Sequence, residues 1–162
     1  MLYRFKSGKN EGKTLEWLAF TDYGRLLYLY NKATEKVLPT RKKNVYEQEL
    51  VNIIALCEKP FVSSKICPIC NKKTVKYLSI RYSSFQSTPS INASYCCCED
   101  LDCKNYYIGI AGSPIEFFPL QISYCMRLSV KGDRLMFYDA LKSLLDISRL
   151  DEKTLKRIFY PS

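Results

Sequence analysis

The sequence predicts an α+β protein with an N-terminal β-hairpin and helices, a central antiparallel four-cysteine ribbon, and C-terminal helices. Apolar residues recur at helical spacing in the first and last parts of the chain. Six of the eight cysteines lie between residues 67 and 103, in a segment with strand-like runs on either side of a Ser-rich stretch. With 162 residues, the chain is long enough for one domain or two small ones.

Charge and patterning divide the chain into three predicted parts. Residues 1–60 form a hairpin-plus-helices module, 61–112 form the four-cysteine ribbon, and 113–162 form a strand and a helical cap that packs on the rest. Their net charges are +4, +3 and +2, so the formal charge of +9 is spread along the chain. No internal repeat is visible, and the most loop-like stretch is Ser83–Ser94.

The first part predicts a short strand, a turn and three helices. Asp22 can cap the second of these helices, and Asn44 with Glu47 three residues later resembles a capping box. The third helix ends before Pro60. The expected elements are a strand over 2–6, a turn over 7–12, and helices that begin near Thr14, Asp22 and Asn44.

The last part predicts one broken strand and two helices. The strand extends over 115–130 and is interrupted at Pro119, Gly132–Asp133 cap the next helix, and a final helix begins near Asp151. The apolar stripes of these helices are interpreted as core faces. Cys57 and Cys125 fall within such patterns and are expected to be small core residues.

Composition excludes several classes of function. The chain has no histidine, which rules out Ser-His-Asp and Cys-His catalysis and His-ligated metals. No apolar run has the length of a signal peptide or a membrane span, so a cytoplasmic location is expected, where reduced cysteines favour metal over disulfides. No pattern of catalytic groups is present, and the chain is not expected to be an enzyme.

The cysteine spacing predicts one structural zinc site. Cys67 and Cys70 form a C-P-x-C turn, and Cys98 with Cys103 forms the second half of the site. Four thiolates complete a tetrahedron and leave no open position. Cys96 shares a strand face with Cys98 and Cys97 faces away, so the third ligand is an open choice among the three, with Cys98 preferred. Strands over 74–81 and 105–112 would complete an antiparallel zinc ribbon.

These residues resemble the zinc ribbons at the C-terminus of type IA topoisomerases. The likeness covers Cys67 to about Gly112, including Tyr95 three residues before Cys98 and Lys104 directly after Cys103. It implies binding of single-stranded DNA through basic and aromatic residues. The long Ser-rich insertion and the additional cysteines depart from that pattern.

A second motif surrounds a glycine–lysine turn near the N-terminus. Its residues are Phe5, Gly8, Lys9, Gly12, Lys13, Thr14 and Leu15, followed by Asp22, Gly24, Leu26 and Leu29. The segment is similar to the domain C-terminal to exodeoxyribonuclease X-like exonucleases, which implies association with DNA-processing proteins. Asn10, Tyr23, Arg25 and Tyr28 depart from the family pattern, and no catalytic residue is carried over. A plain exposed turn remains the alternative.

Basic residues near both motifs are the candidate contacts to nucleic acid. In an unbroken strand Tyr77, Ser79 and Arg81 share one face, which places an aromatic ring beside a cation. The acidic residues Glu99, Asp100 and Asp102 are expected to form a solvated turn. The nucleic-acid-binding candidates are Lys9, Lys13, Arg41, Lys42, Lys43, Lys72, Lys73, Lys76 and Arg81.

The expected function is zinc-stabilised binding of nucleic acid, with DNA favoured over RNA, by an accessory protein of DNA processing or a mobile-element system. The alternative is an adaptor or inhibitor of the phage or plasmid type, which acts on a DNA- or RNA-processing enzyme. A net charge of +9 favours the first and the acidic turn favours the second.

Overall fold

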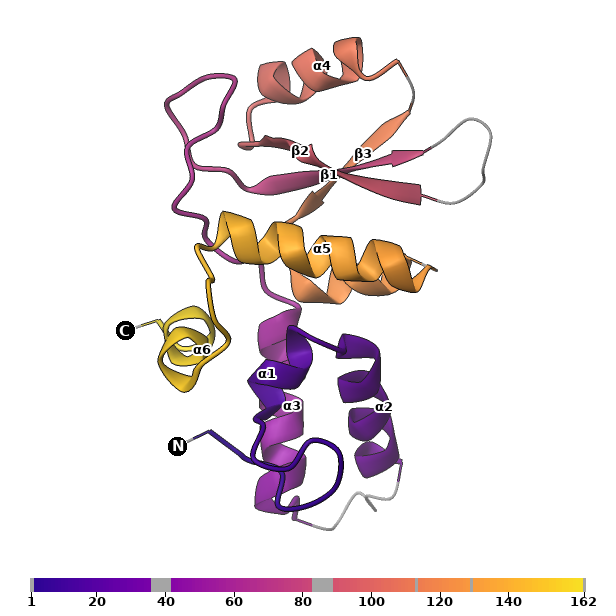
Figure 1. The fold of residues 1–162 in the computed structure, drawn as a ribbon, viewed down its shortest axis with the longest axis vertical. Helices are drawn as coiled ribbons and strands as arrows, with labels where there is room; N and C mark the ends of the chain where they lie inside the picture. Colours follow the sequence, from indigo (N-terminus) through magenta and orange to yellow (C-terminus); the bar gives the residue numbers. More distant parts are fainter. Residues whose placement is uncertain (1, 36–41, 83–88, 113, 129, 162) are drawn as a thin grey trace. The chain divides into compact units, whose positions relative to one another are not determined.

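The computed structural model describes residues 2–35, 42–82, 89–112, 114–128 and 130–161, which form two compact units (Figure 1). Unit 1 comprises Met1–Lys59 and Arg149–Ser162, and unit 2 comprises Pro60–Ser148. Helices and a small antiparallel sheet in the described residues confirm the α+β class. The units differ from the three parts drawn from the sequence, because residues 113–162 are shared between them.

The N-terminal turn of unit 1 is built from tight turns in place of the predicted strand over 2–6. Arg4 and Thr14 form a single antiparallel bridge, and Phe5 exchanges backbone hydrogen bonds with Gly12 and Lys13 at 2.9 and 3.0 Å. Gly8 and Gly12 have φ of 83° and 74°, in the left-handed region that glycine tolerates best. Within the described chain, backbone pairing on the two sides of the turn is limited to Arg4 and Phe5, which is too short for a β-strand.

The three N-terminal helices begin where the sequence predicts. Helix α1 (Leu15–Ala19) is capped by Thr14, and α2 (Tyr23–Thr34) by Asp22, whose carboxylate accepts from the Arg25 N–H at 3.0 Å. Helix α3 (Val45–Cys57) starts with the predicted capping box, in which Asn44 and Glu47 each bond the other's backbone N–H. These caps satisfy N–H groups that a helix start leaves without partners.

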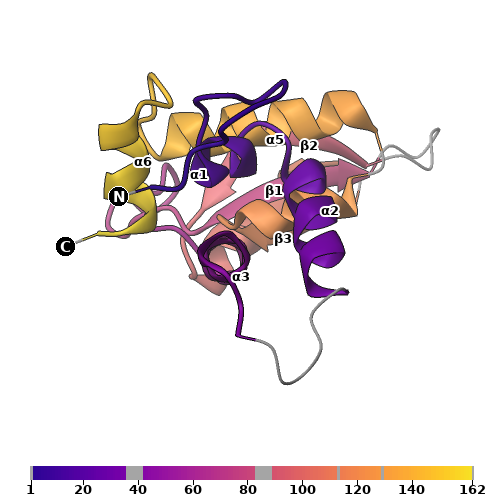
Figure 2. The ribbon, with the colours of Figure 1, turned by 90° about the horizontal axis from the view of Figure 1, so that it is seen from below.

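The core of unit 1 lies around α1. In Figure 2, α1 lies between α6 (Glu152–Phe159) and α2, and it contacts α3 as well. Phe20 meets Phe159 of α6 edge to face at 5.6 Å between ring centroids. Leu155 and Phe159 are buried, as the apolar stripe of the final helix predicts. The other fully buried aliphatic side chains of this unit include Leu15, Leu18, Leu26, Leu50 and Ile53.

Unit 2 is a three-stranded antiparallel sheet with helices on both faces. The strands are β1 (Tyr77–Tyr82), β2 (Pro89–Cys97) and β3 (Ile115–Pro119), in the order β2-β1-β3. Figure 1 shows α4 (Leu101–Ile110) on one face, and α5 (Lys131–Leu144) with the 3-10 helix η1 (Ile122–Arg127) on the other. Leu78 of β1 and Phe118 of β3 pair across the sheet and are fully buried.

Two strand predictions in this unit are wrong. Residues 105–112 fall mostly in helix α4, because Cys103 and Tyr107, four residues apart, are its buried stripe. The third strand is β3, and the predicted strand over 115–130 stops at Pro119. Beyond it, Ile122 and Cys125 are buried at the three-residue spacing of a 3-10 turn.

Smaller differences concern one loop and one helix start. Residues 89–94 of the predicted Ser-rich loop belong to β2, while 83–88 lie outside the described residues. Helix α5 starts at Lys131 after Val130, so Gly132 and Asp133 lie in its first turn and do not cap it.

Candidate metal centre

The first half of the site is a short hairpin that presents two sulfurs. Ile66 and Thr74 form its closing bridge, and the backbone N–H of Cys67 donates to the Lys73 carbonyl at 2.7 Å. Asn71 has φ of 51°, and its N–H donates to the Cys67 carbonyl at 2.9 Å. Asparagine tolerates this left-handed conformation better than most residues, which lets the chain reverse directly after Cys70.

The second half comes from the junction of β2 and α4. Cys98 is the first residue after β2, and Cys103 lies in the first turn of α4. Cys67, Cys98 and Cys103 are buried, and Cys70 is half-buried. The predicted ligand set is therefore brought together, although a helix and not a ribbon strand supplies the fourth sulfur.

The four sulfurs have the spacing that a tetrahedral ion requires. The Sγ atoms of Cys67, Cys70, Cys98 and Cys103 all lie within 4.8 Å of one another, and Cys70 Sγ is 3.8 Å from Cys98 Sγ. Four ligands at the usual zinc–sulfur distance of about 2.3 Å place neighbouring sulfurs about 3.8 Å apart. Both the donor type and the geometry fit a thiophilic metal.

Backbone N–H groups of the hairpin favour thiolates there. Those of Lys73 and Lys72 lower the pKa of Cys70 to about 6. Burial is the largest single influence on Cys67 and raises its pKa, but hydrogen bonds from Cys70, Ile69 and Cys98 together outweigh it, so the pKa is lowered. Cys70 is thus mostly a thiolate at neutral pH before metal binds, and ionisation of Cys67 is also favoured.

The other two ligands hold their protons more strongly. Burial is the main reason that the pKa of Cys98 and that of Cys103 are raised above the ordinary thiol value. Neighbouring thiols add to this effect at Cys103. A metal that binds here must displace protons from both residues.

The two remaining cysteines of the triplet are placed differently from Cys98. Cys97 and Cys96 are paired in the sheet with Tyr77 and Leu78. Burial raises the pKa of Cys97 to about 12, and that of Cys96 is raised as well. Among the described residues, the close group of four sulfurs includes neither, in agreement with the preference for Cys98.

Aromatic rings and one lysine pack around the sulfurs. Tyr107 is buried against the cluster and stacks on Tyr95 at 4.8 Å between centroids. Lys104 places its ammonium 3.7 Å from the centroid of the Tyr77 ring. Of the face predicted for base stacking, Ser79 is completely buried, and Tyr77 is half-buried with Lys104 over its ring.

The acidic turn after β2 is paired with the lysines of the hairpin. Lys73 Nζ lies 3.1 Å from Asp100 and 3.8 Å from Glu99, and Lys76 Nζ lies 2.9 Å from Glu99. The turn is therefore not simply solvated, and two of the predicted phosphate contacts are engaged by carboxylates. Lys72 is exposed and makes no ion pair with the described residues.

The other predicted basic contacts fall in unit 1. Lys9, Lys13, Lys42 and Lys43 are exposed there, while Arg41 and the side chain of Arg81 lie outside what the structure describes. Unit 1 has 15 Lys and Arg against 9 Asp and Glu, a net charge of +6, and unit 2 has 10 against 7, a net charge of +3. The basic excess is greater in the unit without the cysteine cluster.

Comparison of the chain with protein-family models, curated proteins and solved structures gives no match. Both family resemblances therefore stay expectations of the sequence. Among the described residues, no helix combines the length and apolar character that a membrane span needs.

Proposed function

We propose that the protein is a zinc-stabilised nucleic-acid-binding protein, an accessory of DNA processing or a mobile-element system. Zinc is the proposed metal because four cysteine sulfurs at tetrahedral spacing are typical of structural zinc sites. A four-thiolate site leaves no position for water, so the ion would stabilise unit 2 and would not catalyse a reaction. The two family resemblances support the DNA-processing part of the proposal.

The charge of unit 1 is the observation that carries the nucleic-acid part. Its net charge is +6, and Lys9, Lys42 and Lys43 are exposed and make no ion pair with the described residues. A phosphate chain is attracted to such a surface without special geometry, through release of its counterions. Lys73 and Lys76, by contrast, would have to leave Glu99 and Asp100 before they reached a phosphate.

The test is binding of single- and double-stranded DNA and RNA over a series of salt concentrations. Affinity is expected to fall steeply with salt, and Lys9→Ala and Lys43→Ala are each expected to weaken all sequences alike and to reduce the salt slope by about one. Lys73→Ala is the matched control, with a smaller effect because its charge is already paired. A flat salt response would contradict the proposal.

The metal is tested by elemental analysis of protein purified without chelator. We expect about one zinc per chain, since a closed four-thiolate site binds its ion tightly. A protein that is folded and free of zinc would contradict this part.

A protein-binding adaptor or inhibitor is the second candidate, and the surface of α4 favours it. Leu101, Tyr106, Ile108 and Ile110 are each at least half exposed, an unusual number for one ten-residue helix. Exposed apolar groups of this kind are frequent at protein interfaces. Binding to a purified nuclease or polymerase that survives the lysine substitutions, without retention of any oligonucleotide at low salt, would favour this candidate.

A further inference from the structure

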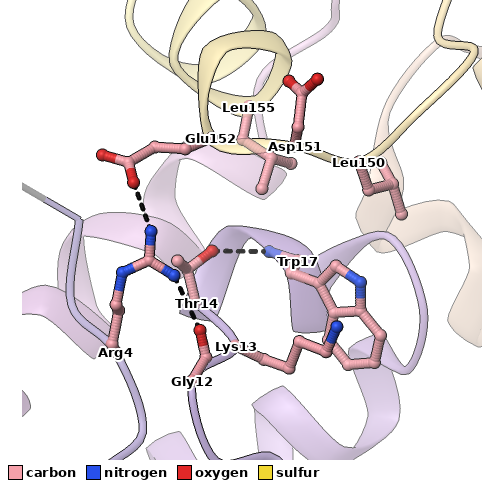
Figure 3. A pocket seen from close by; sticks show the side chains of 9 residues that line it. All are labelled: Arg4, Gly12, Lys13, Thr14, Trp17, Leu150, Asp151, Glu152 and Leu155. Atoms are coloured by element: carbon pink, nitrogen blue, oxygen red, sulfur yellow. Dashed lines mark hydrogen bonds and ion pairs between the residues drawn. The ribbon is translucent and has the colours of Figure 1, made fainter.

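Unit 1 contains a small pocket whose lining includes no metal ligand (Figure 3). It also includes none of the exposed lysines Lys9, Lys42 and Lys43, which we call the lysine surface. Its volume is about 150 Å³, and it lies between the glycine–lysine turn, α1 and the start of α6. Its walls combine two cations, Arg4 and Lys13, the indole of Trp17, and the carboxylates of Asp151 and Glu152.

Segments far apart in the sequence hold this pocket in shape. Arg4 donates to the Gly12 carbonyl at 2.7 Å and pairs with Glu152 at the start of α6. Thr14 accepts from the backbone N–H of Trp17 at 3.1 Å, which fixes the start of α1 and the position of the indole. The dashed lines of Figure 3 follow these contacts around the rim.

The indole offers both a ring and a polar group to a ligand. Trp17 is half-buried, and the ammonium of Lys13 lies 5.1 Å from its ring centroid. Within the described part of the chain, the indole N–H has no hydrogen-bond partner and is able to donate. A cation beside an indole is the combination that binds bases and phosphates of unpaired strands.

The two carboxylates of the pocket are engaged by neighbours. Glu152 is paired with Arg4 and also with Lys156 at 2.9 Å. Asp151 caps α6, where it accepts from the Thr154 N–H at 2.8 Å. Lys13, together with Lys9 on the adjoining turn, is therefore the cationic group left to meet an anionic ligand.

The volume sets the kind of ligand. Sites for whole drug-sized ligands start at about 300 Å³, twice the volume available here. A single ring system fits, provided that the rest of the ligand lies outside on the lysine surface. In a duplex the bases are stacked and paired, so only an unpaired strand can present one of them in this way.

We propose that the pocket receives one unstacked base of a single-stranded nucleic acid against Trp17, with the flanking phosphates at Lys13 and Lys9. This inference rests on the proposed function and narrows it to unpaired strands. Neither the metal centre nor the hairpin lysines take part in the contact.

Trp17 is the sole tryptophan of the chain, which makes the experiment direct. The full-length protein is titrated with a single-stranded oligonucleotide and with its duplex, and tryptophan emission is recorded alongside the anisotropy of a labelled strand. We expect the single strand to quench Trp17 emission in parallel with binding, and the duplex to bind more weakly without quenching.

Substitutions test the same contact. Trp17→Leu and Lys13→Ala are each expected to weaken binding of the single strand by about 10-fold, while Trp17→Phe retains much of the affinity because it keeps a ring. Tyr28→Leu is the matched control, since Tyr28 is an exposed ring 5.0 Å from the Arg25 guanidinium in the same unit, outside the pocket. Unchanged melting temperatures show that the variants fold.

The outcomes separate this inference from the proposed function. Salt-dependent binding with unchanged emission, and with full affinity in Trp17→Leu and Lys13→Ala, would overturn the base pocket and leave the proposed function standing. Equal quenching by the duplex would overturn the restriction to unpaired strands. No binding of any oligonucleotide would overturn both, and quenching by a peptide alone would assign the pocket to a protein ligand.

Discussion

Cys98 stands where the chain has left β2 and has not yet entered α4. Its backbone is no longer tied to the alternation of the sheet, so its sulfur is able to turn toward the hairpin of Cys67 and Cys70. Cys97 is one residue earlier and is still paired with Tyr77 across the sheet. The difference of one position decides which thiol is a ligand and which is a small core residue.

Serine substitutions of the adjacent cysteines are expected to differ sharply. Cys98→Ser removes a ligand and should reduce the zinc content from about one per chain to near zero, with loss of structure in unit 2. Cys97→Ser is the matched control and should keep its zinc. Elemental analysis measures the zinc content and circular dichroism the loss of structure. Loss of zinc in Cys97→Ser but not in Cys98→Ser would show that Cys97 is the ligand.

Zinc affinity is expected to fall as the pH is lowered. Cys98 and Cys103 have raised pKa values in the metal-free protein, so both are protonated at neutral pH and must lose their protons to the solvent. Cys70 has a pKa of about 6 and is mostly a thiolate at neutral pH. Its protonation therefore competes with zinc binding only below about pH 6. Release of at least two protons per zinc near pH 7, from Cys98 and Cys103, should be measurable with an indicator dye in weak buffer. Release of none would contradict the assignment.

Spacing predicts the metal ligands but not the pocket of Trp17, and the reason is physical. Cys67 and Cys70 are close in sequence, and the geometry of one turn fixes their separation. The walls of the pocket come from residues 4–17 and 150–155, and no local rule brings these together. The one sequence signal near it was the glycine–lysine turn, which indicates a special backbone but not what lies opposite.

Helix α3 shows how much a local signal contributes to an element. Its reciprocal cap between Asn44 and Glu47 satisfies two backbone N–H groups, with hydrogen bonds of 2.8 and 2.9 Å. Asn44 is exposed and Glu47 is half-buried, so the cap stabilises the helix start and neither partner is a core residue. Its prediction needed four residues of sequence, Asn44 to Glu47, and no tertiary information.

Removal of this cap has an expected cost. Asn44→Ala should lower the free energy of unfolding by about 1 kcal/mol, the usual value for loss of an N-cap. Val45→Ala is the matched control, because Val45 is 75% exposed and its side chain contributes little packing. Thermal and urea unfolding compare the two, and equal stabilities would show that the cap is of little importance.

Helix α4 illustrates where local signals fail. Residues 105–110 are Asn-Tyr-Tyr-Ile-Gly-Ile, rich in the aromatic and β-branched types that favour strands. The segment is helical because it buries Cys103 and Tyr107 against the sulfurs and the sheet, which only a helical period allows. Here tertiary packing overrides the strand propensity of residues 105–110.

At the scale of the molecule, the amphipathic pattern of α6 predicts a buried face but not its partner. The sequence placed this helix in a C-terminal cap that packs on the rest of the chain, without saying on which element, and in the structure it packs on α1 in unit 1. The buried carboxylate of Glu16 accepts from the Tyr160 hydroxyl at 2.9 Å, a contact across 144 residues. Local sequence patterns do not predict contacts between residues so far apart in the chain.

The two units are expected to respond separately to removal of zinc. The cysteine cluster lies wholly in unit 2, while α1, α2, α3 and α6 form a core of their own. With a strong chelator, hydrogen exchange should accelerate in β1 and α4 and stay slow in α1 and α3. Loss of protection in all of them together would contradict this independence.

The packing of α6 on α1 also has a consequence for the order in which the two units fold during synthesis. Unit 2 is one continuous segment, so it is able to close as soon as residues 60–148 have left the ribosome. Unit 1 starts to emerge first, yet it must wait for Leu155, Phe159 and Tyr160, with Phe20 and Glu16 unburied meanwhile. Unit 1 begins its synthesis first, and we expect its core to be completed after that of unit 2.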